Sequence, residues 1–175
     1  MTDKYIIKLI NSLNRKLDQK DCIKHSISKN VDFAHVWINS TFYKNNPQTF
    51  FLIKNDFGYI GAVLDMSIDL HWVVLPKYRK NGYLINALNT AIIPYLLINA
   101  KREELNISIN ELEIGKKNYE ASMSTALKVG FKKIDDKTLI LKENDFDFSH
   151  EELDIKYKGL TNDQIKEISK KNRAI

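Results

Sequence analysis

One short segment constrains the fold more than any other part of the chain. An apolar run ends at Val74-Leu75-Pro76, a basic turn follows, and a second apolar stretch begins at Leu84. Pro76 cannot continue a central strand, because it has no amide hydrogen for the ladder. Gly82 permits backbone angles that other residues resist. The pattern therefore predicts a strand that breaks into a tight turn and then a helix.

This strand-turn-helix segment predicts an anion site. The first amides of a helix have no partner within the helix, and they lie at the positive end of its dipole. Lys77, Arg79 and Lys80 add positive charge to the same turn. The alternative is an ordinary basic turn, but the glycine and the following helix favour phosphate binding. The residues expected to line the site are Arg79, Lys80, Asn81, Gly82, Tyr83 and Leu84.

Length and composition narrow the class of protein. A chain of 175 residues with 43% hydrophobic residues suits one domain with its own core. The lone Cys22 cannot form an internal disulfide, and no signal-peptide core or membrane-spanning apolar run is visible, so we expect a cytoplasmic protein with no membrane partner. The net charge of +5 suits an anionic cofactor, RNA or DNA equally well. The histidines show no metal-ligand spacing, and no metal site is predicted.

Hydrophobic periodicity predicts the order of the elements. Helices are expected at 5–17, from a cap at Asn30 or Asp32 to Pro47, at 84–100 and at 118–129. Strands are expected at 49–54, 58–64, 68–75, 109–114, 132–134 and 138–141. Pro94 should kink the third helix or mark its last regular turn. This order indicates an α/β fold with one mixed sheet.

Two motifs resemble those of a known family. The segment Val74-Leu75-Pro76-Lys77-Tyr78-Arg79-Lys80-Asn81-Gly82 is similar to the acyl-CoA signature of the GNAT N-acetyltransferase superfamily. The pair Asn118-Tyr119-Glu120-Ala121-Ser122 and Lys128-Val129-Gly130-Phe131 resembles that family's late helix. The resemblance covers roughly residues 49–141. It implies a mixed, mostly antiparallel central sheet flanked by helices over residues 1–144, with a C-terminal helical extension over 145–175.

The resemblance also implies a reaction and a cofactor. Members of this family transfer an acetyl group from acetyl-CoA to a primary amine by direct attack in a ternary complex. In this chain it implies that a backbone amide near Val74 polarises the thioester, that Arg79 to Leu84 hold the diphosphate, and that Asn118 or Tyr119 takes the place of a family asparagine. The chain departs from the family at Leu84, where the phosphate turn usually has Gly or Ala.

Catalytic roles follow from the resemblance in the same way. Asp69 lies close to the place of a family carboxylate base, and His71 points to the same face of the expected strand. Ala126 occupies the place of the tyrosine that usually protonates the departing thiolate, so Ser122 or Tyr119 is the expected substitute. The alternatives are a solvated turn carboxylate for Asp69, a hydrogen-bonded sheet histidine for His71, and a small residue that relieves helix crowding for Ser122.

The sequence does not decide the identity of the acceptor or the role of the C-terminal tail. The acceptor amine could belong to a small molecule, a protein or an aminoacyl-tRNA. Residues 145–175, with a helix expected after Thr161, either pack on the domain or contribute to a homodimer contact. A second class of function is a catalytically weak acyl-CoA-binding or nucleic-acid-associated protein of phage or toxin type. An unrelated nucleotide-binding protein is disfavoured, because the chain has no Gly-x-x-x-x-Gly-Lys run.

Overall fold

The computed structural model describes residues 2–15, 21–37 and 46–155, which form a mixed α/β fold. The helices are α1 (Asp3–Asn14), α2 (Tyr83–Ala87), α3 (Glu111–Ile114) and α4 (Lys116–Val129). The strands are β1 (Cys22–Ser28), β2 (Val31–Val36), β3 (Gln48–Asn55), β4 (Gly58–Asp65), β5 (Leu70–Val74), β6 (Glu104–Ser108), β7 (Lys132–Lys133) and β8 (Thr138–Lys142). Short 3-10 turns follow β5 and β8, at Pro76–Tyr78 and Glu143–Asp145.

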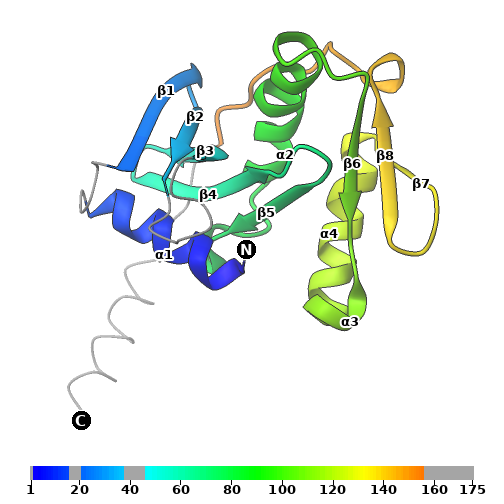
Figure 1. The fold of residues 1–175 in the computed structure, drawn as a ribbon, viewed down its shortest axis with the longest axis horizontal. Helices are drawn as coiled ribbons and strands as arrows, with labels where there is room; N and C mark the ends of the chain where they lie inside the picture. The colour runs from blue at the N-terminus through cyan, green and yellow to red at the C-terminus, as the bar shows by residue number, and fades with distance from the viewer. Residues whose placement is uncertain (1, 16–20, 38–45, 156–175) are drawn as a thin grey trace.

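The strands form two antiparallel sheets rather than the one mixed sheet that the sequence predicted (Figure 1). Strands β1 to β5 follow one another across the first sheet in chain order, while β8 lies between β6 and β7 in the second. The sheets meet where the turn between β4 and β5 lies against β6. There the Arg102 guanidinium donates two hydrogen bonds to Asp65, at 3.0 and 2.7 Å, and the amide of Ser108 donates to Asp69 at 2.9 Å.

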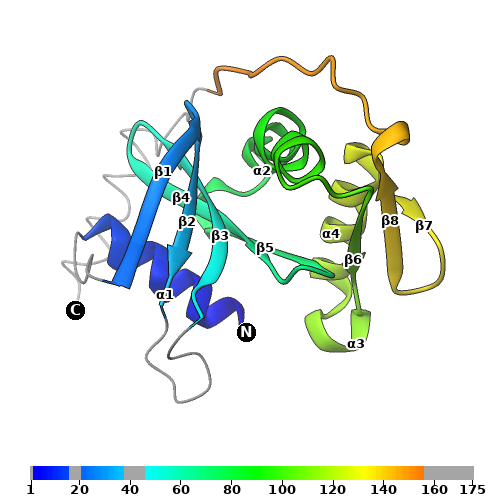
Figure 2. The same ribbon diagram turned by 45° about the horizontal axis from the view of Figure 1, so that its top comes forward.

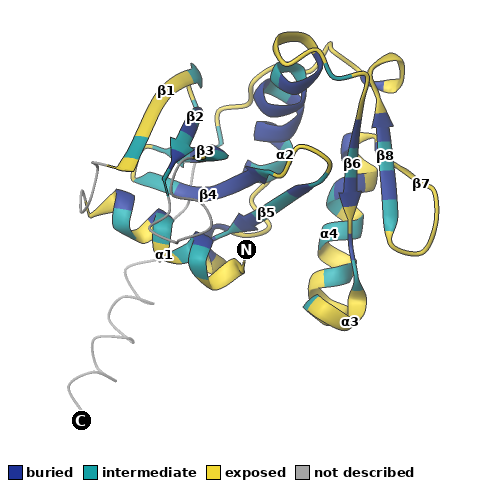
Figure 3. Ribbon diagram, in the orientation of Figure 1, coloured by how far each residue is buried: buried dark blue, intermediate teal, exposed yellow. Residues whose placement is uncertain are grey.

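Helices cover both faces of the first sheet (Figure 2). On one face α1 packs against β4 and β5 and buries Ile6, Ile10 and Leu13. On the other face the ring of Tyr95, from the helical segment that continues α2, contacts Phe33 and Phe51. The buried residues of Figure 3 follow this sandwich, with the central strands β3 and β4 buried between the two helical layers.

The long helix that begins with α2 widens around Pro94. Turns with π-helical hydrogen bonding occupy Leu88–Ile92 and Tyr95–Asn99, on either side of the proline. Proline has no amide hydrogen and its ring clashes with the preceding turn, so the regular α-helical ladder cannot pass through it. The irregularity predicted at Pro94 is therefore present, in the form of wider turns.

Residues 22–36 correct the first of two secondary-structure predictions. They form the hairpin of β1, a strand that was not predicted, and β2, which replaces the start of the helix expected from Asn30 or Asp32 to Pro47. Residues 38–45 of that expected helix lie outside the described residues. The spacing of Phe33 and Val36 fits a helix, but the two side chains lie on opposite sides of a strand. Strand β1 is at the sheet edge and mostly exposed, with Ile23 64% exposed, so its sequence lacks the alternation of a half-buried strand.

The second wrong secondary-structure prediction concerns residues 104–114. The strand lies at Glu104–Ser108, and the predicted strand at 109–114 is instead the single turn α3. Asn110 is the reason, because its side chain accepts a hydrogen bond from the amide of Leu112 and donates one to Glu113. This is an N-terminal capping pattern. The predicted cap at Asn118 is also wrong, since α4 begins at Lys116 and Asn118 donates to the carbonyl of Ile114.

The remaining predicted elements are confirmed to within a few residues. These are α1, the hairpin of β3 and β4, β5, the helix from Tyr83, α4, β7 and β8. Gly130 ends α4 with a φ of 104°, which is the left-handed C-cap predicted for it. Residues 146–155 of the expected helical extension are not helical. They form an extended strap that passes over the start of α2 toward the turn between β1 and β2 (Figure 2). The helix predicted after Thr161 lies outside the described residues.

Candidate functional site

Strand β5 forms the open edge of the five-stranded sheet next to the predicted anion turn. The amide of Leu75 donates to Ile60 at 2.9 Å, and the amide of Met66 donates to Asp69 at 3.0 Å. In an antiparallel ladder these bonds alternate along the strand. The amides of the intervening residues Trp72 and Val74 are therefore directed away from β4. A free backbone amide near Val74 was expected from the sequence, and its role in binding stays a prediction.

The turn after β5 folds back on the end of the strand. The side chain Nε of Arg79 donates to the carbonyl of Val74 at 2.8 Å, and the side chain Nδ2 of Asn81 donates to the carbonyls of Tyr78 and Arg79 at 3.2 and 3.0 Å. Lys80 and Gly82 both have positive φ angles, of 63° and 82°. The turn is thus compact, and its basic side chains remain exposed.

A helix N-terminus follows this turn directly. The first hydrogen bond of the helix runs from the amide of Asn86 to the carbonyl of Gly82. The amides of Tyr83, Leu84 and Ile85 precede that bond and have no helical acceptor. Positive φ at Gly82 brings the backbone into position for these donors, and a bulkier residue would be strained there. The predicted strand, turn and helix start are all present.

The strap covers part of this helix start. The hydroxyl of Tyr83 donates to the carbonyl of Ile155 at 3.3 Å, and the amide of Leu153 donates to the Asn86 side chain at 3.0 Å. The Ile155 side chain lies 3.8 Å from the position that a Cβ would take on Gly82. A cavity of about 220 Å³ lies between the strap and the helix. A ligand at the helix start would therefore contact the strap.

Asp69 and His71 make hydrogen bonds to different elements of the fold. The Asp69 carboxylate accepts hydrogen bonds from the amides of Leu70 and Ser108, both at 2.9 Å. Burial raises the pKa of Asp69, and these hydrogen bonds oppose that shift without cancelling it. His71 lies under α1, with its Nε2 2.8 Å from the Asp3 carboxylate. Asp69 is half-buried at the junction of the sheets, while His71 joins a helix to the sheet.

The predicted site residues Asn118, Tyr119 and Ser122 lie on α4, in a different part of the fold from Asp69 and His71. Tyr119 and Ser122 are half-buried, whereas Asn118 is exposed. Ala126, in the place of the family's usual acid, is fully buried. Within the described part of the chain, no hydrogen bond links Tyr119 or Ser122 to the end of β5. The structure thus places the predicted residues on β5, the turn and α4, with no hydrogen bond among the described residues from Tyr119 or Ser122 to the strand.

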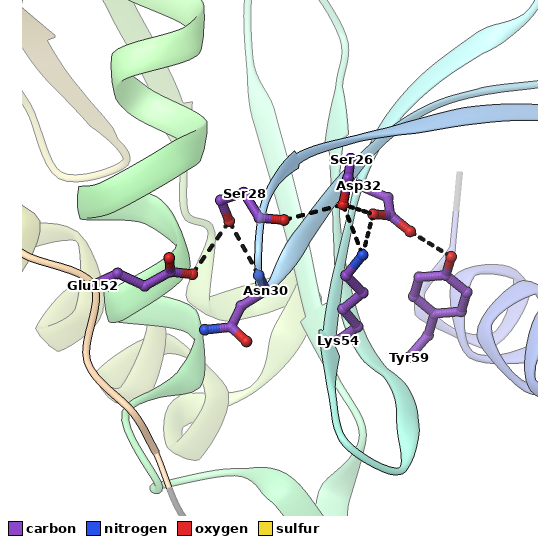
Figure 4. Close-up of polar contacts among 7 residues, drawn as sticks. All are labelled: Ser26, Ser28, Asn30, Asp32, Lys54, Tyr59 and Glu152. Atoms are coloured by element: carbon purple, nitrogen blue, oxygen red, sulfur yellow. Dashed lines mark hydrogen bonds and ion pairs between the residues drawn. The ribbon is translucent and has the colours of Figure 1, made fainter.

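A polar network on β1 to β4 was missed by the sequence analysis (Figure 4). Asp32 is 6% exposed, and its carboxylate accepts hydrogen bonds from the hydroxyls of Ser26 and Tyr59, at 2.7 and 2.6 Å, and from the Lys54 ammonium. Lys54 also donates to Ser26 at 2.8 Å. Asp32 was expected to cap a helix. The useful signal was its position opposite Ser26 in a hairpin, where cross-strand polar pairs form.

The electrostatics of the network indicate a stabilising role. Burial works to raise the pKa of Asp32, but the hydrogen bonds from Lys54, Tyr59 and Ser26 outweigh it and hold the pKa below its usual range. Burial, together with the bond to Asp32, raises the pKa of Tyr59. The Asp32 carboxylate is therefore ionised. Because both of its oxygens accept hydrogen bonds within the network, we interpret the network as structural rather than reactive.

Two further findings concern metals and membranes. Among the residues that the structure describes, no group of three His, Cys, Asp or Glu side chains is placed to hold a metal ion. In the same residues, no helix is long and apolar enough to cross a membrane.

Comparison with protein-family models, curated proteins and solved structures finds no match to this chain.

Proposed function

We propose that this chain is an acetyl-CoA-dependent N-acetyltransferase of the GNAT type that acts on a primary amine. The observation that carries the proposal is one continuous segment, from the outward-directed amide of Val74 through the turn at Gly82 to the free amides of the following helix. It provides hydrogen-bond donors for a carbonyl and for phosphates within a few residues of each other. The two sequence motifs support the same function.

The cofactor would bind along the edge of β5 and the helix start. The amide groups of the pantetheine arm suit an open strand edge, because an extended ligand there can add to the sheet. The diphosphate would accept hydrogen bonds from the amides of Tyr83 and Leu84, where the helix dipole also favours negative charge. Arg79 would exchange its bond to the Val74 carbonyl for one to a phosphate oxygen.

The transfer itself needs a polarised carbonyl, a base and a proton for the thiolate. The Val74 amide would donate to the thioester oxygen as that oxygen gains charge. The amine nitrogen would attack the carbonyl carbon and lose a proton to Asp69, directly or through water, while the carbon–sulfur bond breaks. Ser122 or Tyr119 would then protonate the departing thiolate. The raised pKa of Asp69, caused by its burial, makes its carboxylate a stronger base than that of an exposed aspartate.

A second candidate function is acyl-CoA binding with weak or no catalysis. The observation that favours it is Ala126, whose methyl group lies in the core where a tyrosine hydroxyl would serve as the acid. In this case the donors of Val74 and the helix start would hold the cofactor, while acetyl transfer would be slow. The nucleic-acid-associated form of this alternative would use the exposed Lys77, Arg79 and Lys80.

Calorimetry with acetyl-CoA, CoA and ATP tests the shared part of these functions. Saturable binding of acetyl-CoA and CoA, with weaker binding of ATP, is expected. No binding of CoA would refute both functions together. A screen of amines that follows the release of free CoA then separates the two, because only a transferase releases CoA faster when an amine is present.

Asp69→Asn tests the proposed base. Asparagine keeps a carbonyl oxygen for the amides of Leu70 and Ser108, so the fold and CoA affinity should change little. Turnover should fall by about tenfold or more, since the amide cannot take a proton. Turnover equal to that of the unmodified protein at every pH would exclude Asp69 as the base.

A further inference from the structure

The strap contacts the same residues that frame the proposed cofactor site. The Leu153 amide donates to the side chain of Asn86, and the Tyr83 hydroxyl donates to the carbonyl of Ile155. The Ile155 side chain also lies next to Gly82. Gly82, Tyr83 and Asn86 surround the free amides to which the proposed function assigns the cofactor diphosphate. The strap is therefore bonded to the helix start that the ligand needs.

The space between the strap and the helix is too small for a cofactor. The cavity there has a volume of about 220 Å³, and both Gly82 and Ile155 line it. Pockets that hold drug-sized ligands measure roughly 300–1,000 Å³, and an acyl-CoA is larger than such ligands. A cofactor that binds at this end of the helix therefore requires the strap to move.

The charge of the strap is unfavourable for an anionic ligand beside it. The segment 145–155 contains no lysine or arginine and five acidic residues, which are Asp145, Asp147, Glu151, Glu152 and Asp154. Like charges repel, and the repulsion extends over several ångströms in water of moderate salt. A segment of this charge packed at the helix start competes with a diphosphate and does not help to hold it.

The strap is held weakly enough to open. Its first residue, Phe146, is 7% exposed and anchors it in the core. Residues 147–154 are exposed and belong to no helix or strand. The ion pair between Lys29 and Asp154 spans 3.8 Å and is exposed on both sides, so it adds little stability. Segments with few buried contacts open locally at low free energy, and Phe146 is the point about which this one can turn.

We propose that the strap is an autoinhibitory lid that competes with acyl-CoA for the helix start. In the closed state it is bonded to Tyr83 and Asn86, and in the open state it turns away about Phe146 and admits the diphosphate. The identity of the ligand rests on the proposed function. Because only the open state binds, the measured affinity is the intrinsic affinity multiplied by the open fraction. A strap that closes over bound cofactor, or one that only stabilises the fold, is a contrary outcome of the experiment.

The test is CoA binding to a full-length variant with a released strap. Leu153→Pro removes the N–H that bonds to Asn86 and changes no residue of the helix start. Calorimetry should show CoA bound about threefold to tenfold more tightly than by the unmodified protein, because a neutral hydrogen bond no longer holds the strap closed. Leu153→Ala is the matched control, since it keeps the N–H, and its dissociation constant should not change. If Leu153→Pro does not fold, Ile155→Ala replaces it, and tighter binding is again expected.

Cleavage of the strap by a glutamate-specific protease, at Glu151 or Glu152, gives a second measurement. Mass spectrometry should show faster cleavage when CoA is present, and faster cleavage of Leu153→Pro without CoA. Slower cleavage with CoA, or weaker CoA binding by Leu153→Pro, would overturn the proposal, because the strap would then contact the bound cofactor. Equal CoA affinity in the released and unmodified proteins would overturn the lid and leave the proposed function intact. Absence of CoA binding in every variant would instead refute the proposed function, and the lid with it.

Discussion

The Asp32 network and the start of the helix at Tyr83 differ in whether their polar groups have hydrogen-bond partners. Around Asp32, side chains from four strands satisfy one another, and both carboxylate oxygens have donors. At the helix start, backbone amides precede the first helical bond, and no donor among the described residues reaches the buried Oδ1 of nearby Asn89. A satisfied network stabilises the fold and leaves nothing for a ligand, whereas unpaired groups lower stability and allow binding. The difference separates a part of the molecule that maintains the fold from one suited to function.

Breaking the Asp32 network should give the largest effect on stability. Asp32→Ala removes the acceptor of Lys54, Tyr59 and Ser26 and leaves a half-buried ammonium without its partner. We expect a loss of about 2–3 kcal/mol in the free energy of unfolding, measured by urea denaturation.

The control for this change is Asp136→Ala, which removes an exposed ion pair with Lys133. It should leave the urea midpoint unchanged, because solvent screens such pairs. If Asp32→Ala also left the urea midpoint unchanged, the network would contribute no more to stability than an exposed ion pair.

At the helix start the main expected effect is on binding. Arg79→Ala should weaken acetyl-CoA binding by about tenfold, because a charge-assisted contact to phosphate is lost, while stability changes little. Calorimetry measures the dissociation constant. Lys77→Ala is the matched basic control from the same turn, since the Lys77 ammonium lies over the Tyr78 ring. A dissociation constant unchanged by Arg79→Ala would refute the role of Arg79.

The backbone of the turn gives a smaller effect. Gly82→Ala places a Cβ on a residue with a φ of 82° and should cost about 1 kcal/mol of stability. Lys80→Gly should do the opposite and leave stability equal or slightly higher, because Lys80 already has a positive φ. Thermal unfolding of both variants checks the pair, and a stabilising Gly82→Ala would contradict the described turn.

The smallest expected effect is a difference in pH dependence between two carboxylates. The pKa of Asp32 is held below the unfolded value of about 3.9, so its stabilisation is present at neutral pH and is lost as the pH falls through the folded pKa. The pKa of Asp69 is raised, so its contribution is present below the unfolded value and is lost as the pH rises through the folded pKa.

Variants at these positions should therefore respond to pH in opposite senses. Relative to the unmodified protein, Asp32→Asn should be most destabilised at neutral pH, and Asp69→Asn should gain stability as the pH rises above about 4. Urea unfolding between acidic and neutral pH measures both, with changes below about 1 kcal/mol. Parallel profiles would contradict the two environments.

The sequence predicted the helix-start region better than the Asp32 network, for a physical reason. The turn depends on local rules for proline, glycine and helix ends, which can be read from Pro76 and Gly82 alone. The network depends on the pairing of β1 with β2, and the exposed edge strand β1 carries little periodic signal. Phe33 and Val36 favoured a helix by spacing, but pairing with Phe51 and Gln48 in β3 decided the structure.

The candidate site was predicted in its backbone and less well in its side chains. The direction of the Val74 amide follows from strand register, and the tight turn follows from Pro76 and Gly82. The contacts of His71 with α1 and of Asp69 with Ser108 depend on how separate elements pack, which the sequence does not encode locally. Packing of the tail on the domain was one of two alternatives, but its location over the helix start was not predicted, because an acidic, aromatic segment has no periodicity that identifies its docking partner.

The junction of the two sheets links chemistry to architecture. No continuous ladder joins β5 to β6 among the described strands, and Asp65 and Asp69, at either end of one turn, accept hydrogen bonds across the junction. This turn of the first sheet is thus bonded to the half of the molecule that contains the second sheet and α4. A proton taken up by Asp69 would weaken its charge-assisted bond to the Ser108 amide. Each time the proposed base accepts a proton, the hydrogen bond between Asp69 and Ser108 would weaken. A chemical step would therefore also change how firmly the two sheets are held together.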